Sequence, residues 1–375
     1  MREVSYFSDC YEAARAKFRE AARAAGAAVE TYANSSRGPE GEVRDWLGLP
    51  TATGDTRLAT DVAWIGPRDA ERLLITLSGT HGVEAFCGSA IQVGCLDSGL
   101  YRNLPRGTAW LMIHAINPYG FAWLRRVNED NVDLNRNFID HAQPRPVNTG
   151  YELLKDAICP TEWTDASLAA ARARLDAYER THGPMALQSA ISSGQYGDPL
   201  GVFYGGTAPT WSNRVLDAVL RRHAGRARHV AYIDLHTGLG PYGQGEIMSN
   251  HAAGTAGHAR VVDWYGAEAT SNEDGTSSSA VVAGDTTVGV ERALPAAAVT
   301  GITLEFGTVP LDEMLTAVRA DNWVHLHGDI SAPLGRALKA RMRRAFYPDA
   351  DDWKAMVWER AVDVHERALK GLAAS

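Results

Sequence analysis

The sequence lacks the cysteine pattern of a disulfide scaffold or of a thiolate metal site. Four cysteines occur in 375 residues, and no two of them form a C-x-x-C pair. It also lacks an apolar run of the roughly 18 residues that a membrane-spanning helix needs. The first residues, M-R-E-V-S-Y-F-S-D-C, are too polar for the apolar core of a secretory leader. These absences predict a cytoplasmic protein with no membrane partner.

An excess of positive charge is also missing. The chain has 37 lysines and arginines against 45 aspartates and glutamates, which gives a net charge of -8. This balance argues against nucleic acid or an anionic membrane as the main partner. The remaining composition, with 45% hydrophobic and 22% charged residues, is that of an ordinary enzyme. We therefore expect a small molecule or a peptide as the ligand, while the composition indicates nothing about the oligomeric state.

Short apolar segments alternate with longer amphipathic segments along the chain. Strands are predicted at residues 61–65, 73–77, 109–114, 230–235, 246–249 and 302–306, and helices at 8–30, 84–96, 167–180, 211–223 and 310–324. This alternation indicates an α/β three-layer sandwich with a mixed, largely parallel central sheet. We expect residues 1–375 to form one domain that ends in a helical tail at about 331–375. Two long segments, 192–213 and 271–289, have the length of functional lids or disordered loops.

One strand candidate ends in S-G-T-H-G-V-E, which places His81 three residues before Glu84. The composition predicts one or two such pairs by chance, so the spacing alone carries no information. The setting is more informative, because open α/β sheets bind ligands at the carboxyl ends of their strands. Gly79 and Gly82 allow a sharp turn and a close backbone approach there. A polar histidine near a helix start is the simpler interpretation unless a third ligand exists.

A second strand candidate, residues 230–235, ends in the same way, with His236 followed by Thr237 and Gly238. A catalytic zinc site usually takes three protein ligands from His and carboxylate and leaves one position for water. Two histidines and one glutamate at neighbouring strand ends are able to hold one ion. Taken alone, His236 is better explained as a strand-end histidine bonded to a loop carbonyl.

Two further segments add polar groups. The segment N-V-D-L-N-R-N-F, residues 131–138, contains Asn135 and Arg136. An arginine fork matches a carboxylate with two hydrogen bonds, so this pair suits an anionic end of a substrate, although solvated loops commonly carry surface arginines. Glu305 interrupts the apolar strand at 302–306 near its end. Because an unpaired buried carboxylate is costly, Glu305 is either part of a structural ion pair or a group with a chemical task.

The order of these motifs resembles that of the zinc carboxypeptidase family: H-G-V-E, then D-L-N-R-N-F, then a strand-end His and a strand-borne Glu. The resemblance covers residues 73–307, and D-L-N-R-N-F is its most specific piece. The strings G-T-H-G-V-E and D-L-H-T-G are also similar to the aspartoacylase and succinylglutamate desuccinylase group of the same superfamily. The strings W-L-R-R-V-N-E-D-N-V-D-L-N-R-N-F and G-Q-Y-G-D-P-L-G-V-F-Y-G-G most resemble a bacterial branch of carboxypeptidase-like proteins.

The resemblance implies one Zn2+ per chain, bound by His81, Glu84 and His236. Asp133 is the implied carboxylate behind a ligand histidine, where it fixes the tautomer and the ring orientation. An ion held in this way activates a water molecule. Hydrolysis of an amide bond by that water is the implied reaction.

The resemblance also implies which groups act on the substrate. Arg126 polarises the scissile carbonyl and stabilises its oxyanion. Asn135 and Arg136 hold a substrate carboxylate, and Glu305 is the general base. The expected substrate is a small peptide or an amino-acid-derived amide that carries a carboxylate. A small-molecule N-acyl amino acid deacylase with the same site is the alternative, and a metal-binding homologue without catalysis is a third interpretation.

The chain departs from the family pattern in two ways. His81 and His236 are 155 residues apart, more than a compact member of the family requires, and the excess is an insertion at about residues 139–211. We expect this insertion to cover the site and restrict substrate size. Digestive carboxypeptidases also supply a mobile tyrosine, for which Tyr242 and Tyr265 are both candidates here.

Overall fold

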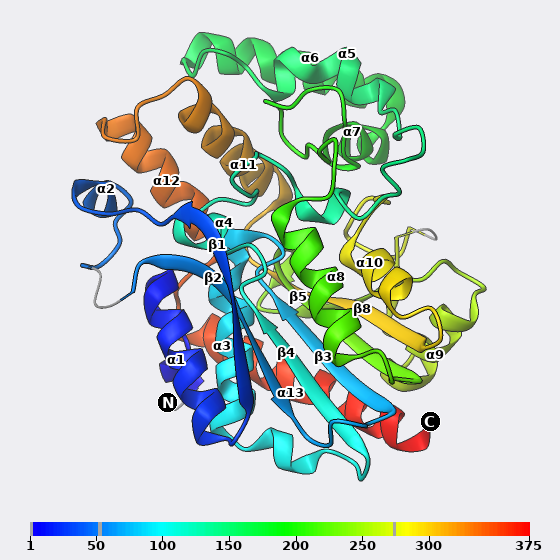
Figure 1. Ribbon diagram of the computed structural model, residues 1–375. Helices are drawn as coiled ribbons and strands as arrows, with labels where there is room; N and C mark the ends of the chain where they lie inside the picture. Colours follow the sequence, from blue (N-terminus) through cyan, green and yellow to red (C-terminus); the bar gives the residue numbers. More distant parts are fainter. Residues whose placement is uncertain (1–2, 52–54, 273–274) are drawn as a thin grey trace.

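The computed structural model describes residues 3–51, 55–272 and 275–375, and these residues form one mixed sheet of eight strands (Figure 1). The strands are β1 (Ala28–Arg37), β2 (Arg57–Ile65), β3 (Arg72–Ser78), β4 (Thr108–His114), β5 (His229–Tyr242), β6 (Gly245–Ser249), β7 (Thr270–Ser271) and β8 (Ala298–Gly307). Their order is β1-β2-β4-β3-β5-β8-β6-β7. The four central strands β4, β3, β5 and β8 are parallel, while β1, β2 and β6 join antiparallel. The predicted α/β fold with a mixed, largely parallel sheet is confirmed.

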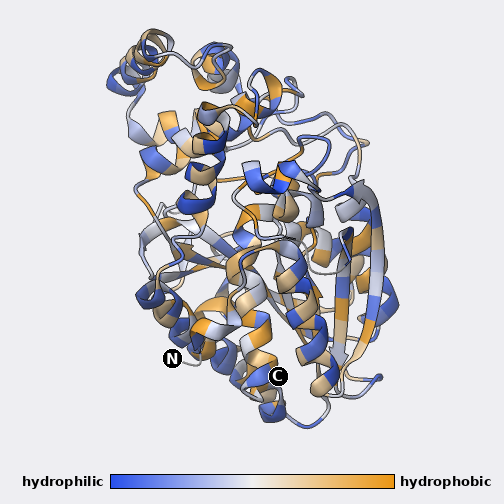
Figure 2. Ribbon diagram, turned by 90° about the vertical axis from the view of Figure 1, so that its left-hand side faces the viewer, coloured by the Kyte–Doolittle hydropathy of each residue, from blue (hydrophilic) through white to orange (hydrophobic). Residues whose placement is uncertain are grey.

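Helices cover both faces of the sheet, because side chains along a strand alternate between two apolar cores. In β3, Leu73, Ile75 and Leu77 face one core, and Leu74 faces the other. The helices on the Leu74 side are α1 (Tyr11–Ala24), α3 (Ala85–Asp97), α9 (Ala256–Tyr265) and α13 (Asp351–Ala374), and those on the opposite side are α8 (Trp211–His223) and α10 (Thr286–Ala293). The covering helices carry hydrophobic and hydrophilic residues in bands (Figure 2), as helices with one buried face do.

A further group of helices lies beyond the carboxyl ends of the parallel strands, at the top of Figure 1. The group consists of α5 (Thr149–Ile158), α6 (Asp165–His182) and α7 (Pro184–Ser192) from the predicted insertion, and of α11 (Leu311–Leu326) and α12 (Pro333–Phe346) after β8. The short helices α2 (Glu42–Trp46) and α4 (Pro118–Ala122) lie in connections near β1 and β2. About half of the insertion is therefore helical, and residues 193–210 are its longest irregular segment.

The predicted helix at residues 8–30 is wrong at its C-terminal end. α1 stops at Ala24, Gly26 takes a φ of 75°, and β1 begins at Ala28. The prediction missed β1 because this edge strand is mostly exposed and carries polar side chains, so its apolar alternation is weak.

The second long loop is also shorter than predicted, because α10 begins at Thr286 rather than after residue 289. Asp285 is the N-cap of this helix, and its side chain accepts a hydrogen bond from the Thr287 backbone N–H. Residues 273–274 of that loop lie outside the described residues. The tail contains α12 and α13, which flank the predicted break at residues 347–349. No helix among the described residues is both long and apolar enough to cross a membrane.

Candidate metal centre

Strand register brings the predicted site residues to one edge of the sheet. β3 and β5 pair in parallel with Ser78 opposite Leu235, and β5 and β8 pair with His236 opposite Glu305. His81 follows Ser78 by three residues, so it leaves the sheet at the same edge. The carboxyl ends of three neighbouring parallel strands therefore carry both histidines and the strand-borne glutamate.

A tight turn after β3 positions Glu84 beside His81. Residues Gly82–Glu84 form one 3-10 turn, whose Gly82 N–H donates to the Arg126 carbonyl over 3.1 Å and whose Val83 N–H donates to the Arg125 carbonyl over 2.8 Å. A Cβ at Gly82 would lie 2.0 Å from the carbonyl carbon of Gly120, so only glycine fits this close approach. The turn thus joins the His81 segment to the backbone of the predicted arginine segment.

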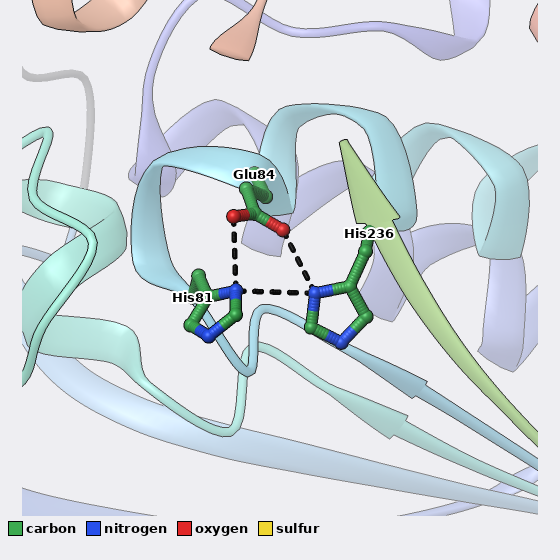
Figure 3. Close-up of side chains that lie close together, drawn as sticks. All are labelled: His81, Glu84 and His236. Carbon is green, nitrogen blue, oxygen red and sulfur yellow. Dashed lines mark hydrogen bonds and ion pairs between the residues drawn. The ribbon is translucent and has the colours of Figure 1, made fainter. Parts of the chain in front are cut away.

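Three side chains meet at the end of this turn (Figure 3). Glu84 Oε1 lies 2.9 Å from His81 Nδ1, and Glu84 Oε2 lies 2.9 Å from His236 Nδ1. The two Nδ1 atoms are 3.1 Å apart. All three side chains are buried, and one donor atom from each lies within 4.8 Å of the others. No other group of this kind is found in the parts of the chain that the structure describes.

Each histidine has a buried carboxylate behind it. His81 Nε2 lies 3.1 Å from Asp133 Oδ1, as the resemblance implied, and His236 Nε2 lies 2.9 Å from Asp234 Oδ2 without hydrogen-bond alignment. Such contacts favour a proton on Nε2 and leave the Nδ1 lone pair free for a metal. Asp234 is held in turn by hydroxyl groups of Thr80 and Thr286, at 2.8 and 2.7 Å.

Asp234 was not among the predicted site residues, although the sequence contains a signal for it. Asp234 and His236 are two residues apart on β5, and side chains at this spacing point to the same face of a strand. An acid two positions before a strand-end histidine is therefore placed to contact that histidine.

The donor set fits a divalent cation with nitrogen and oxygen ligands. With both Nε2 atoms facing carboxylates, two nitrogen lone pairs and one carboxylate converge on a single point. Burial opposes the charged form of His236, but Asp234 and Glu84 outweigh it and raise its pKa well above the ordinary value. Burial likewise opposes ionisation of Glu84, and His81 and His236 lower its pKa nevertheless. The surroundings therefore favour positive charge at this point, and zinc is the ion that such His2Glu sets commonly bind.

Arg126 is tied to this cluster by two carboxylates. Its Nε donates to Asp133 Oδ2 over 2.9 Å, and its Nη1 donates to Glu84 Oε1 over 3.2 Å. Asp133 therefore contacts both His81 and Arg126. Burial opposes ionisation of Asp133, but Arg126 and Arg136 are the main charges that hold its pKa well below the usual range.

Asn135 and Arg136 lie beside Arg126, in a turn that begins at Asp133. The Asn135 side-chain oxygen accepts the Thr286 backbone N–H at 3.2 Å. Arg136 donates to the carbonyls of Asn135 and Ser192, and no hydrogen-bond partner for its buried Nε is found among the described residues. The predicted anion-binding pair is therefore next to the cluster, but backbone carbonyls already engage two arms of the guanidinium.

Glu305 is the remaining predicted residue, and it is 7% exposed. Its Oε1 accepts the Leu239 backbone N–H at 2.9 Å. Burial, together with the charge of Glu84, raises the pKa of Glu305 to about 8. A carboxyl group with a raised pKa, aimed into a cavity beside a metal-binding set, has the properties of an acid/base group.

Comparison with known proteins identifies the family. One family model, DUF2817, with the description "protein of unknown function", matches residues 7–360. The chain belongs to the DUF2817 family. No curated protein matches the sequence.

Solved structures resemble this DUF2817 chain at a distance. Carboxypeptidase A from Helicoverpa armigera has 13% identity and a TM-score of 0.42, over 90% of this chain and 74% of that one. Bovine thrombin-activatable fibrinolysis inhibitor has 12% identity and a TM-score of 0.41, over 90% and 96%. An aspartoacylase family protein from Mesorhizobium loti has 14% identity and a TM-score of 0.33, over 79% and 66%. Because these likenesses are distant, the chemistry of the site is inferred from its own residues.

The site of this DUF2817 chain opens into a cavity of about 160 Å3. Seven of the eight predicted site residues line this cavity, and the eighth, Asp133, does not. Gln188, Ser192 and Phe203 from the insertion line it as well, and so do residues 279–282 of the second long loop. The Gln188 side chain donates to the Ser278 carbonyl over 2.9 Å, which joins the insertion to that loop. The insertion therefore lies against the site.

Neither tyrosine candidate is part of this cavity. Tyr265, the last residue of α9, is fully buried in the core, and Tyr242 donates to Asp352 Oδ1 over 3.2 Å near the surface. No sequence pattern distinguished the two candidates, and the structure brings neither one to the candidate metal ligands.

Proposed function

We propose that the protein is a zinc-dependent hydrolase that cleaves an amide bond in a small peptide or amino-acid conjugate carrying a carboxylate. The observation that carries this proposal is the convergence of two Nδ1 atoms and Glu84 beside a buried glutamate with a raised pKa. A structural zinc site usually takes four protein ligands, whereas this cluster offers three, which leaves one position for water as in catalytic sites.

His81, Glu84 and His236 are the residues that would hold the ion. Zinc in such a set lowers the pKa of bound water from about 15.7 towards about 7 and polarises a carbonyl oxygen. Glu305 accepts the proton of the attacking water and then delivers it to the leaving amine. Without the ion, burial and the charge of Glu84 raise the pKa of Glu305. The positive charge of a bound ion would lower it again, so that the carboxylate is available to accept the proton.

Arg126 faces the negative charge that develops on the carbonyl oxygen. Its Nε and Nη1 are held by Asp133 and Glu84, and no hydrogen bond to its Nη2 is found among the described residues. A fixed guanidinium with a free arm is a preorganised donor for an oxyanion, and such donors usually contribute the largest single part of catalysis. Asn135 and Arg136 are the proposed contacts for the substrate carboxylate.

The deacylase alternative is favoured by the insertion. Gln188, Ser192 and Phe203 line the cavity, and the Gln188–Ser278 bond crosses from α7 to the facing loop. A covered cavity favours a small N-acyl amino acid over the end of a long peptide. We therefore include N-acyl amino acids and dipeptides as separate substrates in the test.

The test combines metal analysis with a hydrolysis screen over dipeptides and N-acyl amino acids. Purified protein should contain about one zinc per chain. Glu305→Gln should retain that zinc and lower kcat by roughly 100- to 10,000-fold, the range typical of general acid–base groups. Glu246→Gln is the matched control, because Glu246 is the register partner of Glu305 on β6 and does not line the cavity. Full turnover by the Glu305→Gln protein would refute the mechanism, and activity on neither substrate class would favour a non-catalytic metal-binding protein.

A further inference from the structure

Phe203 occupies a backbone conformation that a phenylalanine rarely adopts. Its φ is 55°, in the left-handed region, where bulky residues are strained. Such residues persist only where their surroundings enforce them, and they cluster at functional sites. Phe203 lies in the irregular part of the insertion, and its side chain lines the cavity.

Backbone pairing holds this residue in place. The Gln195 N–H donates to the Phe203 carbonyl over 3.1 Å, and the Gly205 N–H donates back to the Gln195 carbonyl over 2.9 Å. The next carbonyl, that of Tyr204, accepts the Asp133 N–H at 2.8 Å. The Phe203 segment is therefore attached directly to the residue that orients His81 and Arg126.

The Phe203 ring lies against both arginines of the site. The guanidinium carbon of Arg126 is 5.2 Å from the ring centroid, and that of Arg136 is 5.7 Å from it. Both distances are within the roughly 6 Å over which a cation is attracted to an aromatic face. The ring of Phe203 thus contacts the guanidinium groups of both arginines.

This arrangement bears on the repulsion between the two guanidinium groups. Both approach Asp133, with Arg126 Nε at 2.9 Å from Oδ2 and Arg136 Nη1 at 3.9 Å from Oδ1. Burial is the main cause that lowers the pKa of Arg136, and the charge of Arg126 lowers it further, although Asp133 opposes both. Arg126 also contacts Glu84, whereas the ion pair found for Arg136 among the described residues is the 3.9 Å contact with Asp133, so the aromatic face supplies additional stabilisation chiefly for Arg136.

We propose that Phe203 is a positioning residue through which the insertion sets the spacing of Arg126 and Arg136, so that both can bind anionic groups of one substrate. Asp133 fixes the edge of the Arg126 guanidinium, and the ring fixes the face of each arginine. The insertion therefore does more than cover the cavity. The substrate class in this inference rests on the proposed function, while the role of the ring does not.

The test measures binding of succinate, a small dicarboxylate, to the zinc-loaded protein by calorimetry. Phe203→Leu keeps apolar volume but removes the aromatic face, and it should weaken binding about tenfold, since a desolvated cation–π contact is worth about 1.4 kcal/mol or more. Phe203→Tyr should bind within about twofold of the original protein, because the ring remains. Leu200→Ala is the matched control, since Leu200 is an exposed residue of the same segment that does not line the cavity.

A fourth variant separates the ring from the backbone strain. Phe203→Gly suits the positive φ and removes the ring, so it should fold stably and show the same tenfold loss. Zinc content should be unchanged in all four variants. Equal binding by the Phe203→Leu and original proteins, equal weakening by Tyr and Leu, or no succinate binding by the original protein would each overturn the inference. Succinate binding without hydrolysis of any amide would refute the proposed function alone, because binding still reports the role of the ring.

Discussion

Glu305 and Asp321 are both buried carboxylates, yet their pKa values shift in opposite directions. Asp321 on α11 is 3% exposed and Glu305 is 7% exposed. Burial opposes ionisation of Asp321, but its partners, led by Lys339, hold its pKa at about 2. Burial and the charge of Glu84 raise the pKa of Glu305 to about 8. Depth of burial is similar, so the difference comes from the charges of the neighbours.

Asp321 and Glu305 differ in whether nearby side chains supply enough positive charge to balance the carboxylate. Asp321 receives a short contact from Lys339 Nζ and a 3.1 Å hydrogen bond from Arg125 Nε, so its cluster is complete. At the metal-binding set, Glu84 and Glu305 face each other's charge, and Arg126 is already engaged by Asp133. The positive charges of the Asp321 cluster come from the chain itself, whereas the candidate metal centre has the donor atoms and the negative charge that could hold a cation.

Removal of a proposed metal ligand should have the largest effect on the candidate metal centre. His236→Ala removes one of two nitrogen donors, and because coordination is the main source of metal affinity, zinc should fall from about one per chain to a small fraction, with loss of turnover. Atomic emission after gel filtration measures the zinc. His251→Ala is the control, since His251 lines the same cavity but bonds to the Gly301 N–H instead. Undiminished zinc in the His236→Ala protein would contradict the ligand assignment.

Replacement of Lys339, the lysine of the Asp321 cluster, should have the next largest effect, in this case on the free energy of unfolding. Lys339→Met leaves a buried carboxylate without its main partner, and we expect a loss of about 3 to 5 kcal/mol in the free energy of unfolding. Urea unfolding measures it.

The exposed pair Lys155–Glu152, with a 3.4 Å separation, offers the control for that experiment. Lys155→Met should cost no more than about 1 kcal/mol, because water screens exposed ion pairs. Similar losses for the two variants would show that burial does not distinguish these pairs. Zinc content should stay unchanged in both.

Sequence patterns predicted those parts of the molecule that depend on local order. His81, Glu84, His236 and Glu305 could be placed at one sheet edge because strands ended before or at each motif, and parallel strands share that edge. The central strands were found because they are almost wholly apolar. β1 was missed because its residues are mostly exposed and polar, so its existence depends on pairing with β2.

Long-range contacts could not be predicted in the same way. Phe203 lies in a segment whose length indicated a functional lid or a disordered loop, but nothing local shows that its ring reaches Arg126 and Arg136. The Asp321 cluster joins residues up to 215 positions apart, since Lys339 also donates to the Leu124 carbonyl. Such pairings follow from the packing of whole helices, and a single sequence does not record them.

The stability contributions of Glu305 and Asp321 should depend on pH in opposite directions. The unfolded pKa of a glutamate is about 4.3, and Glu305 in the metal-free fold has a pKa of about 8. Between these values the native state binds a proton that the unfolded state has lost, so the Glu305 contribution to stability falls as the pH rises from about 4 to about 8. Asp321 behaves oppositely, because its contribution is present above about pH 4 and is lost as the pH falls towards 2.

Glu305→Gln removes the first of these dependences and leaves the second. In protein stripped of metal with a chelator, we expect the variant to exceed the original in the free energy of unfolding at pH 7 and to match it at pH 4. Urea unfolding at the two pH values measures both differences, and Glu246→Gln should show neither. A constant difference between the Glu305→Gln and original proteins at pH 4 and pH 7 would mean that Glu305 does not hold a raised pKa, and the contrast with Asp321 would fail, because then both carboxylates would be ionised in the fold at neutral pH.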